Sequence, residues 1–312
     1  MTKRTIVLII LLSSVYNIIA QSWQDIDNAV RLSDNFNETQ RQLTFYAENR
    51  DFCDYYVQIS FATEGFEGMP RTAFLTIANG KQQIFKYKAR EGAPRYSYRY
   101  TYTMYRGNSQ KFPNIDFSYQ LPVKDGDKVN SEIIESKFGY QLQFLVFNDT
   151  LYACRGGIIC NDNLKDFSAK GHQTFISRQN SSQITIYHAD ASFGEYVFNG
   201  KSLVYPGEIV EMGTPIAIFK KNSSFDDSVD DYDNDNEVNW MLFSTYFLDK
   251  NKVRDQSHGN KHTHFRPFFQ TYNYGKTRLE NQIDYLCQQT DIMFMQDMNR
   301  LQKKRYMQNK SK

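Results

Sequence analysis

The sequence predicts a mainly β protein, with an N-terminal immunoglobulin-like β-sandwich, a second antiparallel β domain and a C-terminal helix. The chain is rich in Tyr and Phe and poor in Pro, a composition that favours strands. Short alternating segments with turn signals between them follow one another from residue 52 to residue 121, as in a sandwich. Of its 312 residues, roughly 290 remain after an N-terminal signal, which is enough for two domains.

The first 20 residues read as a secretory signal peptide. Lys3 and Arg4 form its positive start, residues 5–19 form a short apolar stretch, and Ala20 supplies a small residue for cleavage. The apolar stretch is shorter than the roughly 20 residues that a membrane-spanning helix needs. No later segment is apolar enough to span a bilayer. We therefore expect a periplasmic or secreted protein with no transmembrane segment after signal cleavage.

The first domain is expected over residues 21–125, with a polar connector at residues 124–127. Asn79 and Gly80 form a strong hairpin signal between two of its strands. A later strand alternates so that five large side chains share one face, namely Tyr96, Tyr98, Tyr100, Tyr102 and Met104. This face could be an aromatic platform for sugar rings or the packed inner face of the sandwich. Cross-strand aromatic pairs commonly stabilise sheets, which favours packing.

The four cysteines are Cys53, Cys154, Cys160 and Cys287. An exported protein is expected to contain disulfides. Cys154 and Cys160 lie on one predicted strand and would be ~20 Å apart, too far for a bridge. A bridge between Cys53 and Cys287 stays open. The four spacings do not resemble those of a zinc cluster.

Positive and negative charges nearly balance over the whole chain, but acidic residues are concentrated in one segment. The formal net charge of +2 gives no footprint for nucleic acid or an anionic membrane. Residues 223–238 form an acidic insertion in which Asp231, Asp233 and Asp235 alternate like the start of a calcium loop. Leu242 stands where such a loop needs its bidentate glutamate. We expect a solvated acidic loop rather than a calcium site.

Four segments in the second half share their order and spacing with a known family. They are a tyrosine-led segment at 140–144, a strand at 151–158, a histidine-x-aspartate hairpin at 188–192 and a proline-glycine turn at 206–213. Together they resemble the core of the lysostaphin/LytM-type zinc metallopeptidases, which cut peptidoglycan cross-bridges. The resemblance implies a lysostaphin-like antiparallel β domain, the duplicated hybrid motif fold, over residues 126–288.

The resemblance also implies which positions would hold the zinc ligands and the general base. In this sequence those positions carry residues of other types. Gln143 occupies the position of the aspartate ligand, and Phe198 replaces the histidine that follows the hairpin tyrosine. Trp240 and Leu242 stand where the closing strand of the family has two histidines. With His188, these residues form a predicted vestigial active-site groove. We therefore predict no catalytic residue, no metal ligand and no cofactor.

Three function classes follow from these observations. The preferred one is a non-catalytic pseudopeptidase that binds peptidoglycan or an envelope protein such as a cell-wall hydrolase. The second is an active zinc metalloendopeptidase with relocated ligands, for which His262 and His264 are candidates because residues i and i+2 of a strand share a face. The third is a structural component of an envelope or secretion complex.

The last segment, residues 289–312, is expected to be a helix with a basic tail. Thr290 is a suitable N-cap, and Asp291 in the first turn complements the helix dipole. Apolar residues then recur at helical spacing: Ile292, Met295, Met298 and Leu301. This stripe is expected to pack on its own domain or, alternatively, to dock a partner.

Overall fold

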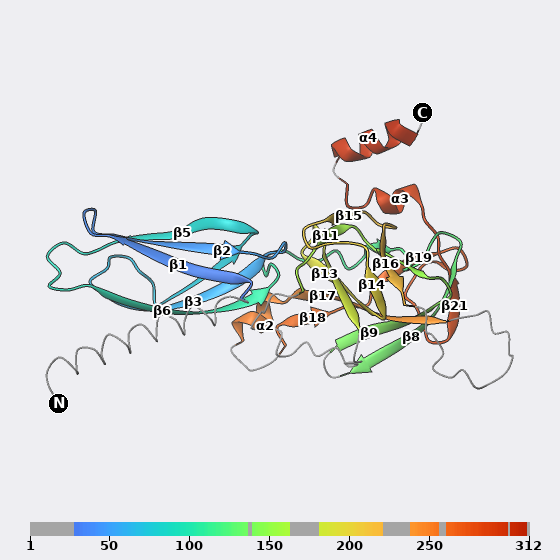
Figure 1. Cartoon of the computed structure of the whole chain (residues 1–312), viewed down its shortest axis with the longest axis horizontal. Helices are drawn as coiled ribbons and strands as arrows, with labels where there is room; N and C mark the ends of the chain where they lie inside the picture. Colours follow the sequence, from blue (N-terminus) through green and yellow to red (C-terminus); the bar gives the residue numbers. More distant parts are fainter. Residues whose placement is uncertain are drawn as a thin grey trace.

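The computed structural model describes residues 28–136, 139–162, 181–220, 238–255, 260–298 and 300–310. These residues form a mainly β protein, as predicted, with a sandwich beside a larger β domain and short helices near the C-terminus (Figure 1). The expected signal peptide and nearly all of the acidic insertion at 223–238 lie outside the described residues. None of the helices described is long and apolar enough to cross a membrane.

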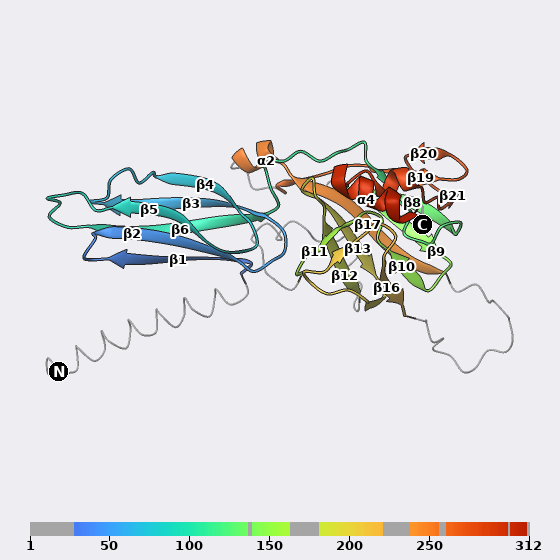
Figure 2. The ribbon, with the colours of Figure 1, turned by 90° about the horizontal axis from the view of Figure 1, so that it is seen from above.

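The N-terminal domain consists of two antiparallel three-stranded sheets. One sheet has the order β1 (Val30–Asn37), β2 (Gln42–Asn49) and β5 (Gly80–Lys88). The other has the order β4 (Thr72–Ile77), β3 (Tyr55–Glu64) and β6 (Ser97–Arg106). This order matches strands A, B and E and strands C′, C and F of an immunoglobulin-type sandwich. After β6 the described chain leaves for the second domain instead of adding a strand to this sheet (Figure 2).

The tyrosine face of β6 points into the sandwich. The ring of Phe45 on β2 meets Tyr98 edge-on at 6.1 Å between centroids and Tyr100 at 5.3 Å. Both tyrosine hydroxyls donate hydrogen bonds to Asp34, and Met104 is fully buried. Edge-to-face contacts of this kind stabilise a sheet packing. The stripe is therefore part of the sandwich core and does not present a flat platform for sugar rings.

The second domain is built on a nine-stranded antiparallel sheet. Its main path runs β15, β11, β12, β13, β17, β9, β8 and β21, and β18 pairs with β17. The strands are β8 (Lys128–Ser136), β9 (Gly139–Val146), β11 (Gly157–Ile159), β12 (Ser182–Tyr187), β13 (Ser192–Phe198), β15 (Ile209–Val210), β17 (Asn239–Leu248), β18 (His262–His264) and β21 (Ile283–Leu286). The alternating and continuous apolar runs of β9, β13 and β17 place these strands at its buried centre.

Two small sheets complete this domain. One has the order β10 (Thr150–Tyr152), β16 (Pro215–Phe219) and β14 (Gly200–Ser202). The other has the order β20 (Gly275–Thr277), β19 (Phe268–Thr271) and β7 (Ser118–Tyr119), with β7 parallel to β19.

The core of the second domain begins before the expected boundary at residue 125. Phe117, Tyr119, Leu121 and Val123 alternate along the chain and are all buried in the same hydrophobic cluster as β9 and β17. The polar connector expected at 124–127 is a turn inside this domain, where the Gly126 amide donates to the Cys287 carbonyl. The segment that joins the domains is therefore the stretch after Arg106, because β6 ends there.

The C-terminal region contains two short helices instead of the single expected one. They are α3 (Asp291–Phe294) and α4 (Arg300–Lys310), while α2 (Lys250–Arg254) follows β17. Thr290 caps α3 as expected, since its hydroxyl accepts from the Met293 amide. The helix ends because Gln296 hydrogen-bonds with the backbone of Ser118 through both polar side-chain atoms. This tertiary contact holds a turn where the periodicity alone predicts a continuous helix.

Candidate functional site

The register of the central sheet separates the predicted groove residues onto two faces. Leu242 on β17 pairs directly with Gln143 on β9, and Trp240 lies on the same face two residues away. Phe198 on β13 pairs with Met241, so it points to the opposite face. Phe198 and Leu242 are both almost completely buried. The four side chains therefore do not converge on one point as the ligands and base of a zinc site must.

His188 lies at the end of β12, on the same face of the sheet as Phe198 but far from it. Gly194 on β13 faces this histidine, since a Cβ on Gly194 would lie 3.1 Å from the His188 Nε2. Phe198 is four residues further along the same strand, which is about 13 Å away. The His188 Nδ1 is 2.8 Å from the Gly156 carbonyl oxygen. Burial and the nearby Arg155 lower the pKa of His188 to about 3, so its imidazole is neutral.

His262 and His264 lie on β18, where both rings contact Tyr246 of the neighbouring strand at centroid distances of 5.2 Å and 5.4 Å. The Nε2 of His262 is 2.8 Å from the Arg106 carbonyl oxygen, and burial lowers its pKa to about 4. In the described part of the chain, neither histidine belongs to a group of three or more potential metal ligands. The pair shares a strand face, as expected, and lies at the junction of the two domains.

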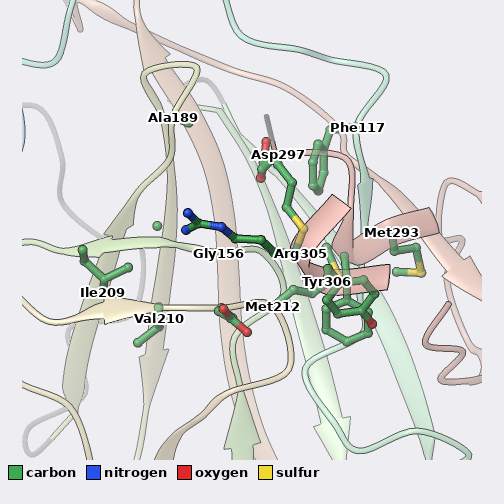
Figure 3. A pocket seen from close by; sticks show the side chains of 14 residues that line it. Phe117, Gly156, Ala189, Ile209, Val210, Met212, Met293, Asp297, Arg305 and Tyr306 are labelled. Carbon is green, nitrogen blue, oxygen red and sulfur yellow. The ribbon is translucent and has the colours of Figure 1, made fainter. Parts of the chain in front are cut away.

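A cavity of about 420 Å³ opens between the edge of the central sheet and the C-terminal helices (Figure 3). The strand side is formed by the glycine pair at the start of β11 and by β15, and the other side by α3, α4 and the turn between them. Its lining is largely apolar, with a few charged side chains. The lining residues are Phe117, Gly156, Gly157, Ala189, Ile209, Val210, Glu211, Met212, Met293, Phe294, Asp297, Met298, Arg305 and Tyr306.

The wall of this cavity is held by a buried arginine. Arg155 is 1% exposed and makes two hydrogen-bonded contacts with Asp297, at 2.9 Å and 2.6 Å. Its Nη1 lies 2.9 Å from Asp190 of the hairpin motif, and its guanidinium stacks on Phe117 at 3.8 Å. Burial opposes ionisation of Asp190, but Arg155 together with the hydrogen bonds from Ser192 and the Asn114 amide outweighs it, and the pKa of Asp190 falls to about 2. The hairpin motif thus anchors the C-terminal segment over the cavity.

The two domains meet at a second cluster of polar side chains. Arg106 at the end of β6 pairs with Asp51 at 2.9 Å and with Asp162 at 2.8 Å. Close by, burial raises the pKa of Glu195 to about 7, and its carboxylate lies 3.5 Å from the Tyr246 hydroxyl. None of these contacts has a local sequence signal, because each joins residues far apart in the chain.

Three possible ligand atoms gather in this cluster. One atom each of Asp51, Cys53 and Cys160 lies within 4.8 Å of the others, and all three residues are buried. Cys287 is elsewhere, with its Sγ 3.4 Å from the Val123 carbonyl oxygen in the core of the second domain. The Cys53–Cys287 pair left open by the sequence is therefore not formed. Sequence spacing could not reveal the Cys53–Cys160 pair, since docking of the domains creates it.

Comparisons with known proteins give a distant structural likeness. No family model matches the chain, and no curated protein matches it. Among solved structures, the chain is similar to one described as "A Novel M23 Metalloprotease Pseudoalterin from Deep-sea", at 17% sequence identity and a TM-score of 0.27. That similarity covers 56% of this chain and 96% of the other.

Proposed function

We propose that the protein is an exported, non-catalytic relative of the LytM-type peptidases that binds a partner protein of the cell envelope, such as a cell-wall hydrolase. The observation that carries the proposal is the separation of Phe198 from Gln143 and Leu242 onto opposite faces of the central sheet. A catalytic zinc needs three protein ligands around one open position. The residues at the family positions offer an amide and apolar side chains instead.

The apolar cavity beside α3 and α4 is the proposed contact surface. Met212, Met293 and Met298 line it, and methionine side chains adapt to irregular apolar partners. Charged groups at Glu211 and Arg305 provide polar contacts that orient a bound segment. The volume of the cavity lies within the range of pockets that bind ligands, so apolar side chains of a partner protein can enter it.

The zinc content of the mature chain tests the non-catalytic part of the proposal. We expect less than ~0.1 zinc per chain after dialysis without chelator, because the amide and apolar side chains at the ligand positions cannot hold the ion. A peptidase site would hold one zinc per chain. A value near one zinc per chain would sink the proposal and favour the zinc peptidase. In that case, His262→Ala and His264→Ala would show whether these histidines hold the ion.

A charge placed in the cavity tests the contact surface. Ile209 lines the cavity and is 79% exposed, so Ile209→Lys is expected to fold normally and to lose the partner in crosslinking from envelope extracts. Ile292 is similarly exposed at 74% but does not line the cavity, and Ile292→Lys is the matched control. Equal capture by both variants would exclude the cavity as the contact surface. Sedimentation of the protein with purified peptidoglycan, unaffected by Ile209→Lys, would identify the glycan as the partner instead.

A further inference from the structure

Cys53 and Cys160 come from different domains and are buried side by side. Cys53 lies in the loop between β2 and β3 of the sandwich, and Cys160 directly follows β11 of the second domain. They are 1% and 2% exposed and belong to the same hydrophobic cluster as the sandwich core. Cys160 is the one cysteine of the second domain that reaches this cluster, because Cys154 packs in the other core.

The backbone around both cysteines is fixed by hydrogen bonds. The Cys160 amide donates to the Thr185 carbonyl at 2.9 Å, and the Cys53 carbonyl accepts from the Asn49 side chain at 2.8 Å. The two Sγ atoms are within 4.8 Å of each other. A disulfide needs about 2.05 Å between the sulfurs, so the two thiols, which are free in the structure, must rotate toward each other to close it.

A metal ion is a poorer occupant of this cluster, although Asp51 completes a set of three possible ligands. Both carboxylate oxygens of Asp51 are already used. One accepts from the Phe52 and Asn161 amides, and the other accepts from Arg106 and Tyr55. A cation placed here would also face the Arg106 guanidinium, which lies 2.9 Å from the same carboxylate.

We propose that Cys53 and Cys160 form a disulfide bond that fastens the sandwich to the second domain. Each thiol loses a proton and together they give up two electrons to a disulfide oxidant of the thiol oxidoreductase or glutathione class. One thiolate attacks the oxidant to give a mixed disulfide, and the other then displaces the oxidant as a thiol. The oxidant ends with two thiols, so protons and electrons balance.

The bond forms before the domains are fully closed. Burial, followed by the nearby Cys160 side chain, raises the pKa of the Cys53 thiol well above its ordinary value, and the closed cluster excludes an oxidant. Once formed, the bond is equally shielded from reductants. It closes a loop of more than a hundred residues and restricts the unfolded chain, which stabilises the docked arrangement.

A cleavage experiment on the full chain tests the bond. Cys53 is the only cysteine before the inter-domain segment, and residues 110–112 of that segment are exposed. A specific protease site placed there cuts the chain into two parts in the protein exported to an oxidising compartment. We expect the two parts to stay together on a denaturing gel without reductant and to separate with it. Separation without reductant would overturn the proposal.

Peptide mapping identifies the partner of Cys53. Free thiols are alkylated and the protein is digested without reduction, and we expect a linked peptide pair that contains Cys53 and Cys160. Recovery of either cysteine as an alkylated free thiol, or of Cys53 linked to Cys154 or Cys287, would refute the bond. Stoichiometric zinc that is released when the thiols are alkylated would refute it too and assign a metal site.

Two double variants separate this bond from general effects of the cysteines. We expect reductant to lower the unfolding temperature of the unmodified protein by about 5 °C or more. Cys53→Ala with Cys160→Ala should abolish that shift, whereas Cys154→Ala with Cys287→Ala should retain it. A shift of the same size in the first variant contradicts the proposal, and the mapping decides the question if either variant fails to fold.

Discussion

Glu195 is a carboxyl group buried in the middle of β13, where burial raises its pKa to about 7. In the folded protein the Glu195 carboxyl keeps its proton up to about pH 7. In the unfolded chain the same carboxyl has its ordinary pKa and loses the proton at lower pH. Between about pH 4.5 and pH 7 the folded state therefore binds more protons, and stability falls as the pH rises. We expect Glu195→Gln to remove this loss, which is on the order of 3 kcal/mol across the window.

Denaturant unfolding of both proteins at several pH values measures this effect. The stability difference between the parent and Glu195→Gln should change steadily from pH 4.5 to pH 7 and level off outside that range. A difference that is constant with pH would show that Glu195 has an ordinary pKa in the folded protein. Tyr246, Asp162 and Arg106 surround the carboxyl group and stay unchanged in this comparison.

His262 contributes with the opposite sign. Burial lowers its pKa to about 4, so it stays neutral in the folded protein while the unfolded chain gains a proton below about pH 6.5. Stability is therefore lost as the pH falls from 6.5 to 4. We expect His262→Gln, which can still hydrogen-bond the Arg106 carbonyl, to be less sensitive to acid than the parent. Equal acid sensitivity in urea titrations would argue against a neutral buried imidazole.

At the scale of elements, an ion pair ties the C-terminal helices to a residue that is far from them in sequence. Asp297 precedes α4 and holds the buried Arg155 beside β11. We expect Asp297→Asn to cost about 2 kcal/mol, because it leaves a buried guanidinium with less compensation. Hydrogen exchange should rise in α3 and α4 as they detach from the sheet.

An exposed ion pair serves as the control for this change. Lys128 and Asp284 are 3.1 Å apart, but both side chains are about half exposed. Asp284→Asn should therefore cost well under 1 kcal/mol. A similar loss of stability in both variants would show that the Arg155 pair has no special role.

At the scale of the whole molecule, Arg106 pairs with Asp51 inside the sandwich and with Asp162 of the second domain, so it links the two domains. Arg106→Met would leave Asp51 completely buried without its cation, a loss of about 3–5 kcal/mol. We expect the domains to uncouple and to unfold in two thermal steps in calorimetry. A single transition at the parent's temperature would mean that other contacts carry the coupling.

Much of the architecture follows from local patterns in the chain. The alternation of β3 and β6 predicts a sandwich with an aromatic inner face, because period-two patterning places large side chains on one side. Thr290 likewise marks the start of α3 through its capping hydroxyl. The boundary at residue 125 was less predictable, since Phe117 and Tyr119 read as a continuation of the sandwich strands but pack in the other core.

The sequence by itself determined the strand content and the packed aromatic face of the sandwich, and it singled out Gln143, Phe198, Trp240 and Leu242 through a resemblance. These depend on residue type and on spacing within one segment. Only the tertiary structure decided which face of the sheet each of those side chains occupies, where the cavity opens and that Cys53 meets Cys160. The reason is physical, since register and domain docking bring together residues more than a hundred positions apart, and no local pattern records such contacts.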